Sequence, residues 1–197
     1  MCLRQYDKIV LLGAGGSIGK ALYDYFTKEK LKVIGISRRP GPSIHYVLDL
    51  SCAASYEEIN SLITKNTLVL FLAGQSSKQN SFMHWTINTN LWEVCLSNIN
   101  STARLIFFSS VDTILDDKFP IETTSLFWAH YGYSKAQSEK LARKHNIDVL
   151  RVYPFFHNNN RDMLKRSLRI PIIKIGLKVT PDVLIEYDDV HSLITAI

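Results

Sequence analysis

A cluster of four glycines separates the first apolar run of the chain from its first amphipathic stretch, and this arrangement restricts the possible folds more than any other feature. Residues 8–12 (KIVLL) predict a buried strand, and residues 17–28 predict a helix. Glycines between a strand and a helix permit a tight turn and let backbone amides approach a pyrophosphate at the helix N-terminus. The alternative is a sharp turn that binds nothing. The predicted phosphate loop comprises Gly13, Gly15, Gly16, Ser17, Ile18 and Gly19.

Short apolar runs and amphipathic stretches alternate along most of the chain, which is typical of a parallel sheet covered by helices on both faces. Strands are predicted at 8–12, 32–37, 45–48, 68–73, 104–108 and 148–152, and helices at 17–28, 56–64, 82–99 and 131–144. Beyond Pro154 the alternation weakens to a basic helix near 161–169, an extended 170–174 and a last helix from Asp188. The predicted fold class is α/β, a doubly wound, Rossmann-like parallel sheet with a small C-terminal substrate-binding region.

The length and composition favour a single globular domain. The 197 residues are 46% hydrophobic and 21% charged, enough to bury a sizeable core. Within this domain, residues 1–153 are expected to form a dinucleotide-binding core and residues 154–197 a short substrate-binding region with a closing strand and helix. The apolar runs are too short to span a bilayer, so a cytoplasmic protein without membrane contact is expected. Three cysteines at unrelated spacings fit reduced thiols, and neither they nor the six histidines predict a metal site.

The chain is basic, with a formal charge of +5 and a pI near 9.1. No arginine-rich run interleaved with aromatic residues accompanies this charge, so we expect an anionic small molecule as the partner and no nucleic acid. The densest basic stretch has spacings of three and four, which place its side chains along one side of a short helix. That side is either a solvated face or a diphosphate-binding surface. Its members are Arg161, Lys165, Arg166 and Arg169.

The end of the second predicted strand indicates which dinucleotide the loop would bind. A carboxylate at this place accepts hydrogen bonds from the ribose of NAD, whereas the 2′-phosphate of NADP requires cations. The sequence has Ser37, Arg38 and Arg39 here and no acid, which favours NADP(H) over NAD(H). Two solvated arginines are the alternative. Asp49, after the third strand, either contacts the adenine amino group or forms a turn.

Tyr131 and Lys135 stand four residues apart on a predicted helix, so both side chains lie on one face. A phenol and an ammonium placed in this way could act on one substrate atom. Random placement already gives roughly 0.6 such pairs in a chain of this composition, so the spacing alone is weak evidence.

Taken together and in order, these segments resemble a short-chain dehydrogenase/reductase of the extended, sugar-nucleotide-modifying branch. The spacing of Gly13, Gly16 and Gly19 resembles that branch's GxxGxxG, and YGYSK matches its Tyr-x-x-x-Lys signature. The segments FLAG (71–74), INTN around Asn88, FFSSVDTI, LRVYP (150–154) and IEYDDVHSLITAI are similar to further family segments. The likeness thus spans nearly the whole chain.

The resemblance implies roles for individual residues. Tyr131 would donate a proton to a carbonyl oxygen, and Lys135 would lower the pKa of that phenol and contact the nicotinamide ribose. Ser110, with Ser109 as the alternative, would hydrogen-bond the carbonyl oxygen, and Asn88 would support a water chain or simply pack. Further cofactor contacts are implied for Leu50, Leu72, Ala73, Gly74 and Tyr153, and substrate contacts for Ser110, Arg161, Lys165 and Arg166.

The expected activity is NADPH-linked reduction of a carbonyl in a small polar substrate, a nucleotide-activated keto-sugar. An epimerase or dehydratase of the same family and a non-catalytic NADP(H) sensor are the alternatives. Dehydratases of the family carry an Asp-Glu pair where this chain has Val111 and Asp112, which disfavours dehydration. Because the chain is short for this branch, completion of its substrate site by a partner subunit is an open alternative. A homodimer is expected through the helix with Tyr131 and the helix with Trp85, Leu91, Trp92 and Leu96.

Overall fold

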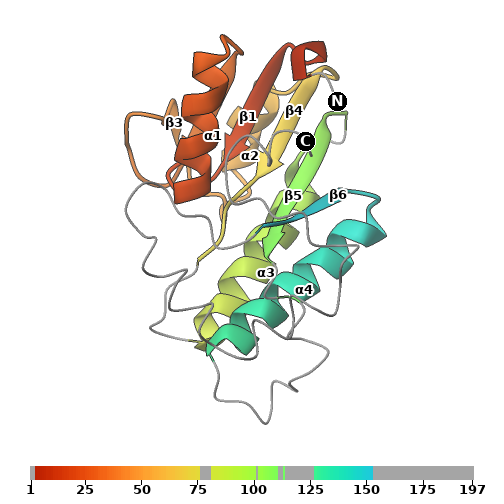
Figure 1. Cartoon of the computed structure of the whole chain (residues 1–197). Helices are drawn as coiled ribbons and strands as arrows, with labels where there is room; N and C mark the ends of the chain where they lie inside the picture. Colours follow the sequence, from red (N-terminus) through yellow and green to blue (C-terminus); the bar gives the residue numbers. More distant parts are fainter. Residues whose placement is uncertain (1–2, 76–80, 101, 111–112, 114–126, 153–197) are drawn as a thin grey trace, which may run out of the picture.

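The computed structural model describes residues 3–75, 81–100, 102–110, 113 and 127–152 (Figure 1). The strands are β1 (Lys8–Leu12), β2 (Val33–Ser37), β3 (Tyr46–Val47), β4 (Thr67–Phe71), β5 (Arg104–Ser110) and β6 (Asp148–Val152). The helices are η1 (Leu3–Gln5), α1 (Ser17–Lys28), α2 (Ser55–Ser61), α3 (Ser81–Asn98) and α4 (Phe127–Lys144). The described residues therefore alternate between strands and helices as the sequence predicts.

All six strands join one sheet in the order β3-β2-β1-β4-β5-β6, and every neighbouring pair is parallel. The chain runs outward from β1 to β3, crosses back, and then runs outward from β4 to β6. The carboxyl ends of β1 and β4 are consequently adjacent at the point where the strand order reverses, which is where open α/β sheets bind ligands. The predicted doubly wound parallel sheet is confirmed.

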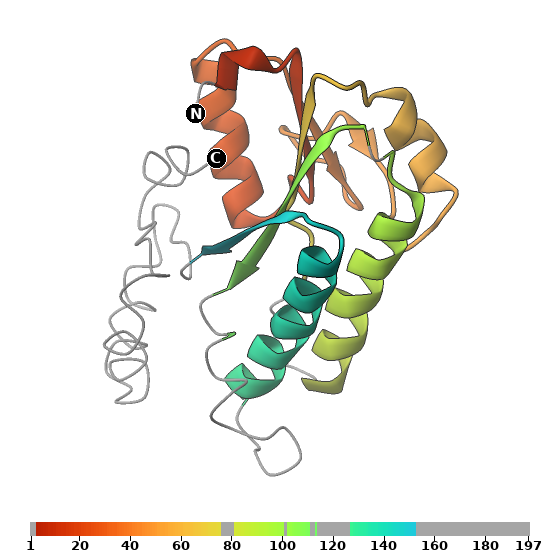
Figure 2. The ribbon, with the colours of Figure 1, turned by 90° about the vertical axis from the view of Figure 1, so that its right-hand side faces the viewer.

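Helices cover both faces of the sheet, and each face has its own core (Figure 2). On one face, Leu22 and Phe26 of α1 pack on alternate residues of β1, β4 and β5. On the other face, α2, α3 and α4 pack on the remaining strand residues. Trp92 of α3 is fully buried there, with its ring centroid 4.6 Å from that of Phe107 and 4.8 Å from that of Phe71. This aromatic group fixes α3 against the centre of the sheet.

Several predicted boundaries are wrong by a few residues. β3 is only a two-residue strand, and α2 ends at Ser61 rather than at residue 64, because Leu62 and Ile63 donate to carbonyls three residues back in a closing turn. β4 ends at Phe71 rather than at residue 73, β5 continues to Ser110, and α4 begins four residues before Tyr131. The short η1 helix is not predicted by the sequence pattern.

The predictions for the C-terminal region fall outside the described residues. These are the helix near 161–169, the extended 170–174, the helix from Asp188 and the whole region 154–197. Of the cysteines that the structure describes, Cys52 and Cys95 are both free thiols. Within the same residues, no helix combines the length and apolarity that a membrane crossing requires.

Candidate active site

Close backbone contacts require glycine at two positions of the loop between β1 and α1. Gly13 has φ +105°, and a Cβ there would lie 2.6 Å from the Ala73 nitrogen in the loop after β4. A Cβ on Gly19 would lie 2.6 Å from the Cα of Ala14. Both positions thus exclude a side chain, Gly13 also because L-residues rarely adopt this φ. The loop backbone is therefore held directly against the loop that leaves β4.

The N-terminus of α1 opens at this loop without a side-chain cap. Gly16 is the N-cap residue and has no side chain to satisfy the N–H groups of the first turn, and the Lys20 nitrogen donates to the Gly16 carbonyl. The N–H groups of the first turn of a helix have no intrahelical acceptor, and they form the positive end of the helix dipole. This end of α1, with Ser17 and Ile18 in its first turn, has the chemistry of an anion site.

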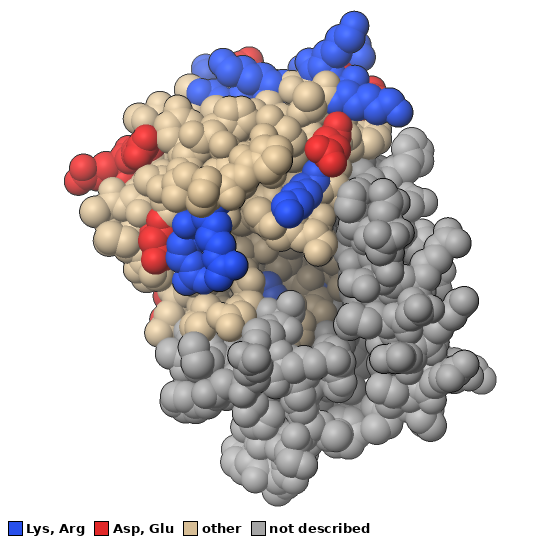
Figure 3. All heavy atoms as spheres, turned by 90° about the vertical axis from the view of Figure 1, so that its left-hand side faces the viewer, with Lys and Arg blue, Asp and Glu red and all other residues tan. Residues whose placement is uncertain are grey.

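The end of β2 lies beside the same loop. A Cβ on Gly15 would be 2.7 Å from the Ser37 Oγ, so the Ser37 side chain lies over the loop. Arg38 and Arg39 follow and are both exposed, and the Arg39 nitrogen donates to the Ser37 Oγ at 3.5 Å. Figure 3 views the molecule from the side of α1 and β3, where Lys and Arg side chains are exposed at several places. Two guanidinium groups are thus available near the glycine loop.

Asp49 and Leu50, both predicted cofactor contacts, have structural partners. An Oδ1 of Asp49 accepts hydrogen bonds from the nitrogen and the Oγ of Ser51, at 2.9 and 2.7 Å. These bonds, and the nearby Arg38 charge, lower the pKa of Asp49. The Leu50 side chain is buried in the core, and its carbonyl accepts from the Tyr56 hydroxyl at 3.2 Å. The turn-forming alternative for Asp49 is therefore realised, and its contact with a cofactor stays a prediction.

Lys135 is the most unusual charged residue of the site, because its amine is buried. The residue is 5% exposed; its Nζ donates to the Phe108 carbonyl at 3.0 Å and lies 5.0 Å from the centroid of the Phe107 ring. Burial lowers the pKa of Lys135 to about 8, and the charge of Glu139 partly opposes that shift. A buried amine with a pKa near neutrality is typical of functional sites, although ion-pair networks produce the same shift.

Asn88 connects α3, α4 and the loop after β4 around this amine. Its Oδ1 accepts from the Gln75 nitrogen at 2.7 Å, and its Nδ2 donates to the Ser134 Oγ at 3.1 Å. A Cβ on Gly74 would lie 3.1 Å from the Asn88 Oδ1 and 3.4 Å from the Lys135 Nζ. The predicted residues Gly74, Asn88 and Lys135 are therefore brought together, beside Leu72 and Ala73 at the exit of β4.

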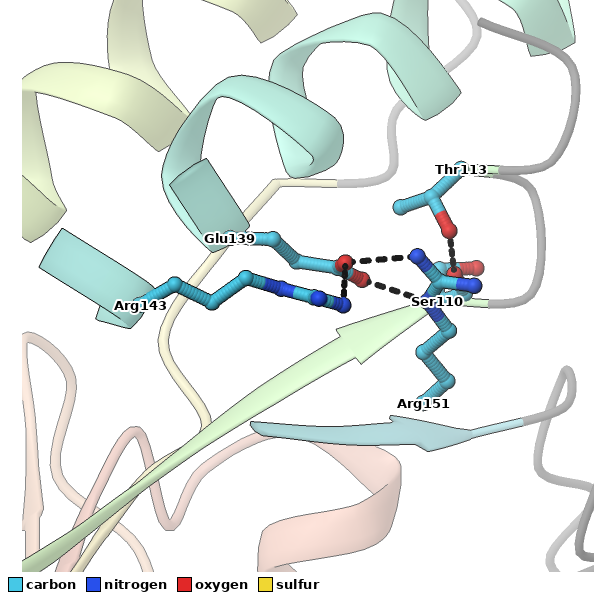
Figure 4. A network of polar contacts seen from close by, with 5 residues as sticks. All are labelled: Ser110, Thr113, Glu139, Arg143 and Arg151. Atoms are coloured by element: carbon cyan, nitrogen blue, oxygen red, sulfur yellow. Dashed lines mark hydrogen bonds and ion pairs between the residues drawn. The ribbon is translucent and has the colours of Figure 1, made fainter. Parts of the chain in front are cut away.

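Tyr131 and Ser110 lie at the borders of this group. Tyr131 is half-buried one turn before Lys135, and its carbonyl accepts from the Ser134 Oγ. Ser110 is the last residue of β5, is buried, and accepts a hydrogen bond from Thr113 at its carbonyl (2.9 Å, Figure 4). The catalytic roles of Tyr131 and Ser110 stay predictions.

Ser109, the alternative to Ser110, follows Phe107 by two residues and therefore points to the same face of the sheet. Its Oγ is buried and has no hydrogen-bond partner in the part of the chain that the structure describes. A buried hydroxyl without a partner is costly and calls for an explanation, such as a ligand or a bound water. This observation supports Ser109 as a candidate beside Ser110.

Two charged residues near Lys135 were not predicted from the sequence. Glu139 of α4 is buried and pairs with Arg151 of β6 (Figure 4). Glu139 stands four residues after Lys135 and eight after Tyr131, so continuing the same helical spacing would have found it. Arg151 has no such signal, because its place depends on the pairing of β6 with β5.

Other predicted site residues fall outside the described part of the chain. These residues are Tyr153, Arg161, Lys165, Arg166 and Arg169. In the ranges that the structure covers, no group of three or more His, Cys, Asp or Glu side chains could hold a metal ion.

Comparison with known proteins places this geometry among dinucleotide-dependent enzymes. The model of the NAD dependent epimerase/dehydratase family matches residues 9–155. Similar solved structures include a yeast methylglyoxal/isovaleraldehyde reductase complexed with NADPH, at 16% identity and a TM-score of 0.60. They also include the UDP-glucose 4-epimerase of Thermotoga maritima with UDP-glucose, at 20% identity and a TM-score of 0.59. A third is a short-chain dehydrogenase/reductase superfamily protein from Agrobacterium tumefaciens with bound NAD, at 19% identity and a TM-score of 0.58.

The three alignments cover different shares of the two partners. Each covers 76% of this chain, but only 58%, 56% and 49% of the reductase, the epimerase and the Agrobacterium protein, respectively. The chain therefore spans about half to three-fifths of the length of these proteins. At this level of identity the likeness establishes the fold.

Proposed function

Because the chain belongs to the NAD dependent epimerase/dehydratase family, we propose that it is an NADPH-linked oxidoreductase that reduces a carbonyl group of a small polar substrate, a nucleotide-activated keto-sugar. The observation that carries this proposal is the buried Lys135 amine, one helical turn from Tyr131 and beside Gly74 and Asn88. A buried cation one helical turn from a tyrosine suits proton transfer to a developing oxyanion.

The residues around the glycine loop fit a nicotinamide dinucleotide. Gly13 and Gly19 leave no room for side chains, and the N-terminus of α1, which has no side-chain cap, would hold the pyrophosphate. Arg38 and Arg39 would take the 2′-phosphate of NADP(H). The bound cofactor supplies the hydride.

The chain's own residues would supply the proton and hold the substrate oxygen. With a pKa of about 8, Lys135 is mostly protonated at pH 7, and its charge favours the phenolate of Tyr131. Tyr131 would give its proton to the carbonyl oxygen, while the hydroxyl of Ser110 or Ser109 donates a hydrogen bond to that oxygen. The bonds of Asn88 to Gln75 and Ser134 would keep the wall of the site in place.

The direct test follows NADPH absorbance with a panel of nucleotide-activated keto-sugars. Tyr131→Phe keeps the ring and removes the hydroxyl, so the fold and NADPH affinity should survive while turnover falls about 10²-fold to 10⁴-fold. Ser109→Ala and Ser110→Ala, measured in parallel, identify which hydroxyl contacts the substrate. Near wild-type turnover of Tyr131→Phe would exclude the proposed proton donor, whereas absence of turnover by the wild-type protein across the panel would favour a non-catalytic NADP(H) sensor.

A second candidate reaction is epimerisation of a nucleotide-activated sugar. The likeness to the UDP-glucose 4-epimerase of Thermotoga maritima and to the UDP-N-acetylglucosamine 4-epimerase of Bacillus cereus favours it. Analysis of the sugar product separates the two reactions. An epimerase interconverts two sugars without net consumption of NADPH, whereas a reductase consumes one NADPH for each carbonyl reduced.

We also propose a homodimer that forms through α3 and α4. These helices lie side by side on one face of the sheet (Figures 1 and 2), and apolar residues of α3 extend around more than its core side. Leu91 and Leu96 are half-buried and could contribute to such an interface. Trp92 of the same helix is fully buried within its own subunit.

A further inference from the structure

The ion pair of Glu139 and Arg151 is the best-formed charge contact near the site. The Arg151 Nε donates to Oε1 of Glu139 at 2.8 Å and its Nη2 to Oε2 at 2.7 Å, a bidentate geometry (Figure 4). The Glu139 side chain is 4% exposed and that of Arg151 is 21% exposed. Arg143, one turn further along α4, reaches the same carboxylate at 3.5 Å but is 67% exposed. The buried pair thus links α4 to the edge strand β6.

This link lies one helical turn after Lys135 along α4. Along α4, Tyr131 precedes Lys135 by one turn and Glu139 follows it by one turn. In the part of the chain that the structure describes, the other elements around the amine contribute uncharged groups, namely the Phe107 ring, the Phe108 carbonyl, the Asn88 amide and Gly74. Within the described residues, Glu139 is the carboxylate whose charge acts on the Lys135 amine.

We propose that Glu139 and Arg151 are positioning residues, which hold the turn of α4 that carries Lys135 against β5 and β6 and balance the charge around its amine. This inference rests on the proposed function of Lys135. Neither residue contacts the reacting atoms; they act through Lys135. The paired arginine is as important as the carboxylate, because it prevents an uncompensated negative charge next to the amine.

Removing either charge of the pair should shift the titration of Lys135, and the two shifts should have opposite directions. Glu139→Gln keeps a hydrogen-bonding side chain of the same shape but removes the negative charge and leaves the Arg151 cation, so Lys135 should lose its proton at lower pH. Arg151→Met removes the cation and leaves the carboxylate, so Lys135 should keep its proton to higher pH. We expect shifts of about half a pH unit or more in each direction. A merely structural pair would move both variants in the same way.

The titration can be measured directly by NMR on protein with ¹³C-labelled lysine. The Lys135 signal is identified by its absence in Lys135→Met, and its chemical shift is followed with pH in each variant. Arg143→Gln is the matched control, because it removes a longer and exposed contact with the same carboxylate and should leave the titration unchanged. Shifts of Glu139→Gln and Arg151→Met in the same direction, or no shift in either, would overturn the proposal.

The double variant Glu139→Gln with Arg151→Met guards against loss of folding, since breaking one side of a buried pair is destabilising. It should titrate between the single variants. If Arg151→Met does not fold, the double variant must still titrate at higher pH than Glu139→Gln, and the reverse order overturns the proposal.

A separate measurement of NADPH affinity against pH distinguishes the two levels of inference. If Lys135 contacts the cofactor, NADPH affinity should fall as Lys135 loses its proton. The pH at which affinity falls should then be lowest in Glu139→Gln, intermediate in the wild type and highest in Arg151→Met. If the variants show the expected order of Lys135 titration by NMR but NADPH affinity does not follow that order, the pair positions Lys135 but the proposed function of Lys135 is wrong.

Discussion

Lys135→Met should stabilise the protein at neutral pH, although it removes a proposed functional residue. The folded protein holds the Lys135 amine in a buried site, where its pKa falls from the ordinary value of 10.5 to about 8, chiefly because burial penalises the charge. Below pH 8 the folded state therefore carries an ammonium in a poorly solvated place. Methionine fills a similar volume and brings no charge into that place.

The size of the effect follows from the pKa difference. Between pH 8 and 10.5 the unfolded chain still binds the Lys135 proton while the folded chain does not, so the wild-type free energy of unfolding rises with pH. A difference of about 2.5 units at about 1.4 kcal/mol each gives a rise of about 3 kcal/mol. Lys135→Met lacks this rise. Its advantage over wild type should be largest at pH 7 and below, and should shrink by about 3 kcal/mol by pH 10.5.

Urea unfolding followed by tryptophan fluorescence at a series of pH values measures this difference. Lys140→Met serves as the control, because Lys140 is an exposed residue of the same helix. Its unfolding free energy should follow the wild-type curve. If the Lys135→Met and wild-type curves run parallel from pH 7 to 10.5, Lys135 does not have a depressed pKa and its burial has no energetic consequence.

Three further outcomes are expected. Gly13→Ala should lower the free energy of unfolding by about 2–4 kcal/mol, through strain at φ +105° and collision with the loop after β4. Gly16→Ala, whose Cβ would meet the nearest atom at 3.6 Å, should change it by less than about 1 kcal/mol in urea unfolding. Calorimetric titration should show that NADPH binds at least about tenfold tighter than NADH, and that the two affinities become equal in the double variant Arg38→Ala with Arg39→Ala. If the double variant still prefers NADPH, these arginines do not bind the 2′-phosphate. Light scattering at micromolar concentration should give the mass of a dimer, and a monomer would contradict the proposed α3–α4 interface.

The sequence was sufficient to predict the elements of the sheet because each has a local signal. The run at 8–12 is apolar and short, and the glycines that follow end it sharply, so β1 and α1 have the predicted bounds. The end of β4 was harder to predict from the sequence. Leu72 and Ala73 continue the apolar pattern, but they leave the strand where Ala73 meets Gly13, a contact with no signal in the local sequence.

The candidate site shows the same division between local and long-range information. Helical spacing alone brings Tyr131, Lys135 and Glu139 onto one side of α4. The contact of Asn88 with Ser134 joins two helices, and the pairing of Arg151 with Glu139 depends on the register of β6, so neither follows from spacing. Leu50 is buried in the core, and its expected contact with a cofactor stays a prediction.

The central place of β1 in the sheet has a consequence for synthesis of the protein on the ribosome. β1 leaves the ribosome before β4, which is one of its two neighbours in the sheet. The end of β1 at Leu12 and the start of β4 at Thr67 are separated by 54 residues. At a synthesis rate of roughly 5–20 residues per second, this edge of β1 waits about 3–11 s for its partner. During that interval the apolar segment Ile9 to Leu12 has an open hydrogen-bonding edge, so the nascent chain is most exposed to misassociation before β4 leaves the ribosome.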